Sequence, residues 1–204
     1  AVKKGSDIKG YEDLKGKKIG YSVSGFETAL LDSMLKSANL SEKDVELVNV
    51  NFSLSPSLMS KQVDAVIGAF RNFELNQLKL EKEEGKVFLP EDYGVPKYDE
   101  LIVVANKDTI SQAKYKNFVK SLQEATNYLK ENPEKSWEAF ISYKPKELDN
   151  ELNRLAWADT LPYLAANPAV FDKEVYNQMA NFMKQNKLIK ALPNLDEYAQ
   201  ELLK

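Results

Sequence analysis

The stretch KKIGYSVSGFETALLDSMLKSA, residues 17–38, decides the fold. Residues 17–23 form a short apolar run that predicts a β-strand, and residues 27–38 carry apolar side chains at helical spacing. The small residues Ser24 and Gly25 lie between them and are typical of a turn that leads from a strand into a helix. The stretch therefore predicts one β-α unit of an α/β protein.

The same alternation continues to residue 90. Strands are predicted over 44–51, 63–70 and 86–90, and helices over 55–62, with Ser55 as N-cap, and over 72–85, closed by Gly85. Strands that alternate with helices indicate a parallel sheet with helices on its faces. Ligands bind such sheets at the carboxyl ends of the strands, where loops lead into helices.

The second half of the chain has a different character. Residues 101–106, LIVVAN, form an apolar run that predicts one more buried strand, and only helices are predicted after it, over 111–131, 133–142, 147–164, 172–187 and 195–203. A β/α half followed by an all-α half indicates two structural units with a hinge near 94–104. One strand is too little sheet for five helices with apolar faces, so we expect a partner β/α segment before Ala1 that this chain lacks.

Composition excludes several classes of protein. The 204 residues include no histidine and no cysteine, which excludes a Cys/His zinc site, a Ser-His-Asp triad and disulfides. The net charge of −3, with only two arginines among 28 basic residues, argues against a nucleic-acid partner. No segment reaches the ~18 apolar residues of a membrane span, and the polar opening of the chain is not a signal peptide. We expect no metal and no cofactor.

The segment GYSVSGFE, residues 20–27, is a first candidate site. The hydroxyls of Ser22 and Ser24 and the backbone N–H groups of the helix start can receive an anion or a polar group. Alternatively, Ser24 caps the helix, Gly25 relieves the turn and Glu27 completes a capping box. No glycine-rich nucleotide fingerprint accompanies the segment.

The segment GAFRNFE, residues 68–74, is a second candidate site. Gly68 permits close approach of the backbone to a ligand, and Phe70 offers a ring for stacking. Asn72 and Glu74 add polar groups, and a carboxylate can accept two parallel hydrogen bonds from a planar N–C–N edge. Alternatively, Asn72 caps the next helix and Glu74 lies in its first turn, where the helix dipole favours an acid.

Four segments, taken in order, resemble the THI5/NMT1-like periplasmic binding proteins. They are DLKGKKIGYSVSG, DAVIGAFRNFELNQLKLEKEEGK, YGVPKYDELIVVANKDTI and AANPAVFDKEVYNQMANFMKQNKLIKALPNLDEYAQELL. The resemblance runs from about Ile8 to Leu203, and the order and spacing of the segments are more specific than any one of them. The nearest group is similar to the thiamine-precursor pyrimidine binders, which are substrate-binding subunits of ABC importers.

The resemblance implies an α/β type II periplasmic-binding-protein fold, with two lobes joined by a hinge and three α/β/α layers. On that map residues 14–97 are the inserted lobe. Residues 1–13 and 98–204 supply the hinge, the return strand and the C-terminal helices of the first lobe, whose N-terminal part is expected to be absent. A monomer in the periplasm, or another extracytoplasmic location, is implied, with a lipid anchor as an option in the missing segment.

The resemblance also implies a set of ligand-binding residues. These are Ser22, Ser24, Gly25 and Phe26 in the first loop, Gly68, Phe70, Asn72 and Glu74 in the second, and Tyr98 at the return crossing. Glu74 is expected to bind the aminopyrimidine edge. The implied ligand is a small heteroaromatic molecule of the hydroxymethylpyrimidine or formylaminopyrimidine type, delivered to an ABC permease in the membrane.

Several alternative functions stay open. They are the binding of riboflavin or a sulfonate, a sensor or regulator domain of the same fold, and the pyrimidine synthesis of the family's fungal branch. That branch uses a histidine and a cysteine cluster in a metal site. Because this chain has no cysteine, a binding protein is expected rather than an enzyme.

Overall fold

The computed structural model describes residues 1–203. The chain divides into two compact units. The first holds residues 1–96 and 182–190, and the second holds residues 97–181 and 191–203. No helix within residues 1–203 has both the length and the apolar character needed to cross a membrane.

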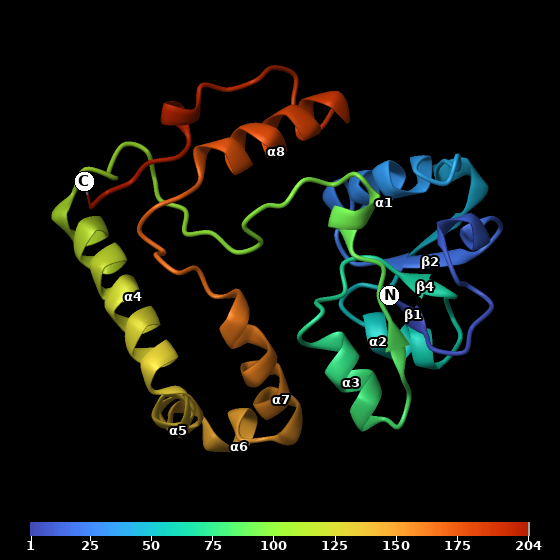
Figure 1. The fold of residues 1–204 in the computed structure, drawn as a ribbon, viewed down its shortest axis with the longest axis horizontal. Helices are drawn as coiled ribbons and strands as arrows, with labels where there is room; N and C mark the ends of the chain where they lie inside the picture. The colour runs from blue at the N-terminus through green and yellow to red at the C-terminus, as the bar shows by residue number, and fades with distance from the viewer. Residues whose placement is uncertain (204) are drawn as a thin grey trace. The chain divides into compact units, whose positions relative to one another are not determined.

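The first unit is built on a five-stranded sheet (Figure 1). The strands are β1 (Val2–Lys3), β2 (Lys18–Tyr21), β3 (Glu46–Asn49), β4 (Ala65–Val66) and β5 (Gly85–Lys86), in the order β3-β2-β4-β1-β5. β2 is parallel to both β3 and β4, whereas β1 is antiparallel to β4 and β5. The helices are α1 (Phe26–Lys36), α2 (Leu54–Met59) and α3 (Glu74–Leu80), with short 3-10 helices η1 (Tyr11–Leu14), η2 (Glu42–Asp44) and η3 (Pro90–Tyr93).

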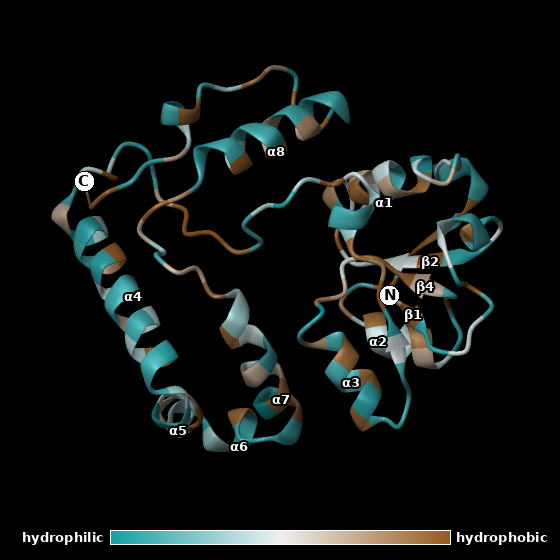
Figure 2. Ribbon diagram, viewed as in Figure 1, coloured by the Kyte–Doolittle hydropathy of each residue, from teal (hydrophilic) through white to brown (hydrophobic). Residues whose placement is uncertain are grey.

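Helices cover both faces of this sheet. Figure 1 shows α1 on one side of the strands and α2 and α3 on the other. On the side of α2 and α3 lies an apolar cluster formed by Val50, Leu54, Leu58, Val63, Val66 and Leu78. A Cβ on Gly20 would lie 3.2 Å from the side chains of Val50 and Val66, so this strand position faces the cluster. α1 buries its own apolar stripe of Leu30, Leu31, Met34 and Leu35, and Figure 2 shows the apolar strands between the helices.

Two predicted helix ends in this unit are wrong. α2 begins at Leu54 with Ser53 as N-cap, so the predicted cap Ser55 lies inside the helix and is buried. α3 ends at Leu80, and Gly85 is a residue of β5 that pairs with Lys3 rather than a helix cap. β1 is only two residues long, too short for a periodic signal, and its pairing with residues 85–86 overrides the local pattern.

The second unit is helical. Its elements are α4 (Ala113–Glu131), α5 (Pro133–Tyr143), α6 (Pro145–Leu148), α7 (Glu151–Thr160), η4 (Leu161–Tyr163), η5 (Leu195–Glu197) and most of α8 (Lys173–Gln185). The predicted helices over 111–131, 133–142 and 172–187 are confirmed to within a few residues at each end. The predicted helix 147–164 is divided, because the Asn150 side chain caps α7 by accepting the Asn153 N–H at 2.8 Å. The predicted helix 195–203 is limited to η5.

The predicted strand over 101–106 is wrong. These residues have no regular secondary structure, and Leu101 and Val104 are 86% and 81% exposed. A strand needs a neighbour for its backbone groups, and all strands that the structure describes belong to the sheet of the first unit. The second unit also has little core: within residues 97–181 and 191–203, only Thr126, Ser136, Trp137 and Ala169 are buried.

The hydroxyl group of Tyr11 is buried in the core of the first unit, which makes the stability of this unit depend on alkaline pH. Its ring is 5% exposed and lies 4.4 Å from that of Tyr93, centroid to centroid, and its hydroxyl donates to the sulfur of Met34 at 3.2 Å. Burial raises the pKa of Tyr11 far above its ordinary value. Above a pH of about 10, therefore, the unfolded tyrosine loses a proton that the folded one keeps.

We therefore expect the free energy of unfolding to fall as the pH rises through the unfolded pKa of about 10, with Tyr11 contributing up to about 1.4 kcal/mol per pH unit. Tyr11→Phe should remove this contribution, and urea unfolding at a series of alkaline pH values measures it. Tyr143→Phe is the control, because Tyr143 is 80% exposed. Equal slopes in the wild type and Tyr11→Phe would contradict the expectation.

Candidate ligand-binding site

The two candidate loops lie at one edge of the sheet. β2 and β4 are parallel neighbours, so their carboxyl ends meet at the same edge, where the Ile67 N–H donates to the Gly20 carbonyl at 2.9 Å. The loop 22–25 follows β2, and the segment 67–73 follows β4. This edge, which we call the strand-end site, contains Ser22, Ser24, Gly25, Phe26, Gly68, Phe70, Asn72 and Glu74.

Tyr98 belongs to the second unit and is half-buried. Its place beside the strand-end site stays a prediction, as does ligand binding by the eight residues of the first unit.

The loop after β2 is organised by Glu27 rather than by Ser24. The N-cap of α1 is Gly25, with φ at 89°, and no side chain caps the helix, so the predicted capping box is wrong. One oxygen of Glu27, Oε2, instead accepts the N–H groups of Ser22 and Val23, at 2.8 and 3.1 Å. The positive φ of Gly25 places Ser24 outside the capping position, and the acid reaches back past it.

Glu27 also joins the two loops. A Cβ on Gly68 would lie 2.4 Å from Oε1 of Glu27, so the carboxylate packs directly on the glycine backbone. Gly68 has φ at 84°, which disfavours any other residue there. The sequence pattern predicts only a helix-capping role for Glu27. The signal was an acid in the first helical turn after a parallel strand, but its long reach depends on a turn geometry that the sequence pattern does not specify.

Glu74 is the first residue of α3. Its Oε2 accepts the Phe70 N–H at 2.7 Å. Burial raises the pKa of Glu74 above the ordinary glutamate value, and this hydrogen bond from Phe70 acts in the opposite direction. A carboxylate has about four acceptor positions, so one backbone bond leaves capacity for a ligand. The N-cap of α3 is Phe73, so the alternative in which Asn72 caps this helix is wrong.

The strand-end site is rich in hydrogen-bond acceptors. Glu27 and Glu74 bring two carboxylates to it, whereas Arg71 is ion-paired through Nη2 with both oxygens of Glu91, at 3.0 and 3.2 Å. Phe70, whose backbone N–H is bound by Glu74, is 44% exposed and offers an aromatic surface in the same segment. The arrangement suits a planar ligand with hydrogen-bond donors. Within residues 1–203, no group of three or more acidic side chains is placed to hold a metal ion.

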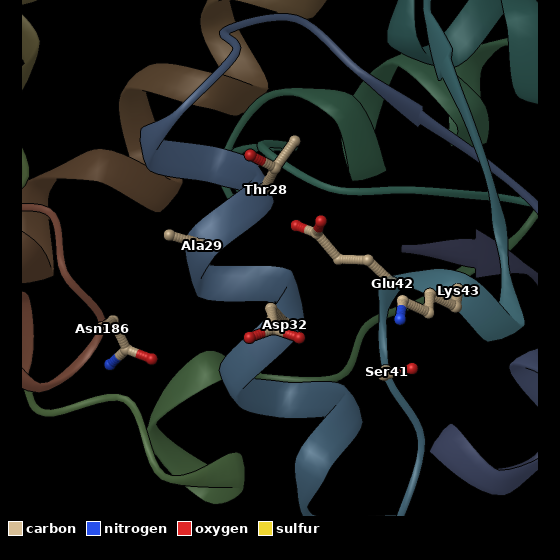
Figure 3. A pocket seen from close by; sticks show the side chains of 7 residues that line it. All are labelled: Thr28, Ala29, Asp32, Ser41, Glu42, Lys43 and Asn186. Atoms are coloured by element: carbon tan, nitrogen blue, oxygen red, sulfur yellow. The ribbon is translucent and has the colours of Figure 1, made fainter.

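A hollow of about 430 Å³ lies elsewhere in the first unit, beside α1 (Figure 3). Its lining residues are Thr28, Ala29, Asp32, Ser41, Glu42, Lys43 and Asn186. Asp32 is ion-paired with Lys36 at 2.6 Å, and the Ser41 hydroxyl donates to Asp44 at 2.9 Å. The lining has no aromatic ring, and two of its polar groups are engaged locally, so the strand-end site is the better candidate for a heteroaromatic ligand.

The chain is similar in sequence to several known proteins. A family model described as NMT1/THI5 like matches residues 1–136. A putative thiamine biosynthesis protein of Haemophilus influenzae is 61% identical over 201 residues, which cover 98% of this chain and 64% of that protein. A formylaminopyrimidine-binding protein of Halalkalibacterium halodurans is 36% identical over 101 residues, 50% of this chain and 31% of that protein. The 4-amino-5-hydroxymethyl-2-methylpyrimidine phosphate synthase THI11 of Saccharomyces cerevisiae is 26% identical over 179 residues, 80% of this chain and 51% of that protein.

A solved structure identifies the fold. The periplasmic aliphatic sulphonate binding protein SsuA of Escherichia coli matches with a TM-score of 0.67 at 16% identity, over 98% of this chain and 64% of that chain. The predicted periplasmic-binding-protein fold is confirmed, and at this identity the likeness shows the fold alone. The chain spans less than two thirds of the length of each of these relatives.

Proposed function

The chain belongs to the NMT1/THI5-like family, and from this premise we propose that it acts as a substrate-binding component of an ABC importer for a thiamine-precursor pyrimidine. The observation that carries the proposal is Glu74, a half-buried carboxyl group at the start of α3, in the segment that follows the parallel strand β4 and also holds the exposed Phe70. The 36% identity to a protein named for binding formylaminopyrimidine supports the same ligand class.

The chemistry of an aminopyrimidine matches these groups. Its edge carries an amino donor next to a ring-nitrogen acceptor, and its face can stack on an aromatic side chain. A carboxyl group complements that edge when it shares one proton with the ring, because one oxygen then accepts from the amino group while the other bonds the ring nitrogen. The raised pKa of Glu74, caused by burial, favours such sharing.

Calorimetric titration of the full-length protein with hydroxymethylpyrimidine and with formylaminopyrimidine tests this proposal. We expect saturable binding of at least one of them with one ligand per protein. Riboflavin and an alkanesulfonate serve as comparison ligands, since they represent the competing predictions. Binding of either comparison ligand in preference to both pyrimidines would overturn the proposal, as would no binding of the pyrimidines.

We further propose that the protein works as a monomer outside the cytoplasm and delivers its ligand to a membrane permease. The support is the periplasmic location named for the E. coli protein that shares the fold. Cell fractionation of the native host tests the location, and recovery of the protein only in the cytoplasmic fraction would contradict it.

A pyrimidine phosphate synthase is the second candidate, favoured by the yeast relative of that name. The absence of cysteine from these 204 residues supports a binding role instead. Iron-dependent formation of a pyrimidine phosphate by the purified full-length protein would establish the enzyme and overturn the transport proposal.

A further inference from the structure

We propose that Glu27 determines the charge of the ligand that this site accepts, because its carboxylate occupies the strand-end amides and thereby excludes anionic ligands such as sulfonates. This inference deepens the proposed function and rests on the strand-end site being the place where the ligand binds.

The amides concerned are groups that recognise anions in other proteins. Consecutive backbone N–H groups in a turn that leads into a helix form an anion-binding concavity. Here the N–H groups of Ser22 and Val23 point at Oε2 of Glu27, at 2.8 and 3.1 Å. The chain therefore supplies its own anion, and an incoming sulfonate finds neither donor available.

The carboxylate of Glu27 is held from a second side. It packs on the backbone of Gly68, where a Cβ would lie 2.4 Å from Oε1. Holding it there requires a glycine at the end of the neighbouring strand, and this glycine is in the left-handed region. Two contacts from two different loops fix the acid in place, so an arriving anion cannot push it aside without breaking both.

Glu74 extends the same pattern to the next strand end. Its carboxylate takes the Phe70 N–H at 2.7 Å, so an internal acid occupies an amide after β4 as well as after β2. Arg71, the cation in this segment, is bound to Glu91. Two carboxylates then repel any anion at this edge and attract groups that donate hydrogen bonds.

A protein of the same fold is named for binding sulphonates, although its sequence is only 16% identical. The fold is therefore compatible with an anionic ligand, and the side chains at the strand ends can select the charge of the ligand. In this chain Glu27 is the residue that converts donor groups into an acidic surface.

The test measures the binding of inorganic sulfate and methanesulfonate to the full-length protein and its variants by calorimetry. We expect no measurable binding by the wild type and at least a tenfold gain in anion affinity in Glu27→Ala, which frees both amides. Glu27→Gln should gain less, because its amide oxygen still accepts the two N–H groups. Glu42→Ala, which removes an exposed acid of the same unit, is the matched control and should resemble the wild type.

Gly68→Ala should also free the N–H groups of Ser22 and Val23, because its methyl group displaces the Glu27 carboxylate without removing it. A gain in sulfate binding in both Glu27→Ala and Gly68→Ala, with both variants folded by circular dichroism, supports the proposal. Anion affinity that stays unchanged in the folded variants overturns it, and so does tight sulfonate binding by the wild type. A wild type that does not bind the pyrimidines would instead overturn the proposed function. Failure of the anion-exclusion proposal and failure of the proposed function are therefore distinguishable.

Discussion

Glu74→Ala is expected to weaken the binding of hydroxymethylpyrimidine by about 2–4 kcal/mol, a loss of roughly 30- to 1000-fold in affinity. The substitution removes a charge-assisted hydrogen bond and leaves the amino group and ring nitrogen of a buried ligand without a partner. Glu74→Gln should have a pyrimidine affinity between those of the wild type and Glu74→Ala. Its amide can still both donate and accept a hydrogen bond, but it carries no charge. Calorimetry on the full-length protein measures all three affinities.

Glu81→Ala is the matched control for this series. Glu81 is an exposed acid at the other end of α3, so its removal changes the net charge equally and should leave affinity unchanged. If Glu74→Ala binds the pyrimidine within about threefold of the wild type, the acid serves only the first helical turn, where the helix dipole favours it by a few tenths of a kcal/mol to about 1 kcal/mol.

The strand ends could be predicted from the sequence because strong local signals mark them. The predicted strand 63–70 contains the uncharged, mostly apolar run 65–70, and in a parallel sheet such a run leads to the ligand-binding edge. β4 itself ends at Val66, so Gly68 and Phe70 lie in the loop after the strand and not within the predicted strand 63–70. β2 likewise ends at Tyr21, so Ser22 opens the loop instead of lying in the predicted strand 17–23. The resemblance to a family then linked these two loops to a ligand class, which the spacing of the residues could not do.

The other features depend on contacts that local patterns do not encode. Residues 101–106 are as apolar as a buried strand, yet a strand forms only where a neighbour pairs with it, and the described residues offer none there. β1 is the reverse case: two residues with no pattern of their own become an interior strand of the sheet, because β4 and β5 pair with them. The reach of Glu27 to Ser22 similarly follows from the positive φ of Gly25.

Gly68→Ala is expected to lower the free energy of unfolding by about 2–3 kcal/mol. About 1–2 kcal/mol of this comes from placing an L-residue in the left-handed region. The methyl group would also overlap the carboxylate of Glu27, which lies at the end of a flexible side chain and can swing away. Swinging away breaks its hydrogen bonds to Ser22 and Val23, and for a half-buried acid that loss is worth about 1 kcal/mol.

Gly94→Ala separates these two contributions, because Gly94 has φ at 85° and open space where its Cβ would lie. It should cost only the left-handed penalty of about 1–2 kcal/mol. In a Glu27→Ala background, Gly68→Ala should then cost as little as Gly94→Ala, which gives a coupling energy of about 1 kcal/mol in a double-mutant cycle by urea unfolding. A coupling energy of zero would mean that Glu27 does not join the two strand ends, and the contact with Gly68 would then not hold its carboxylate over the strand-end amides.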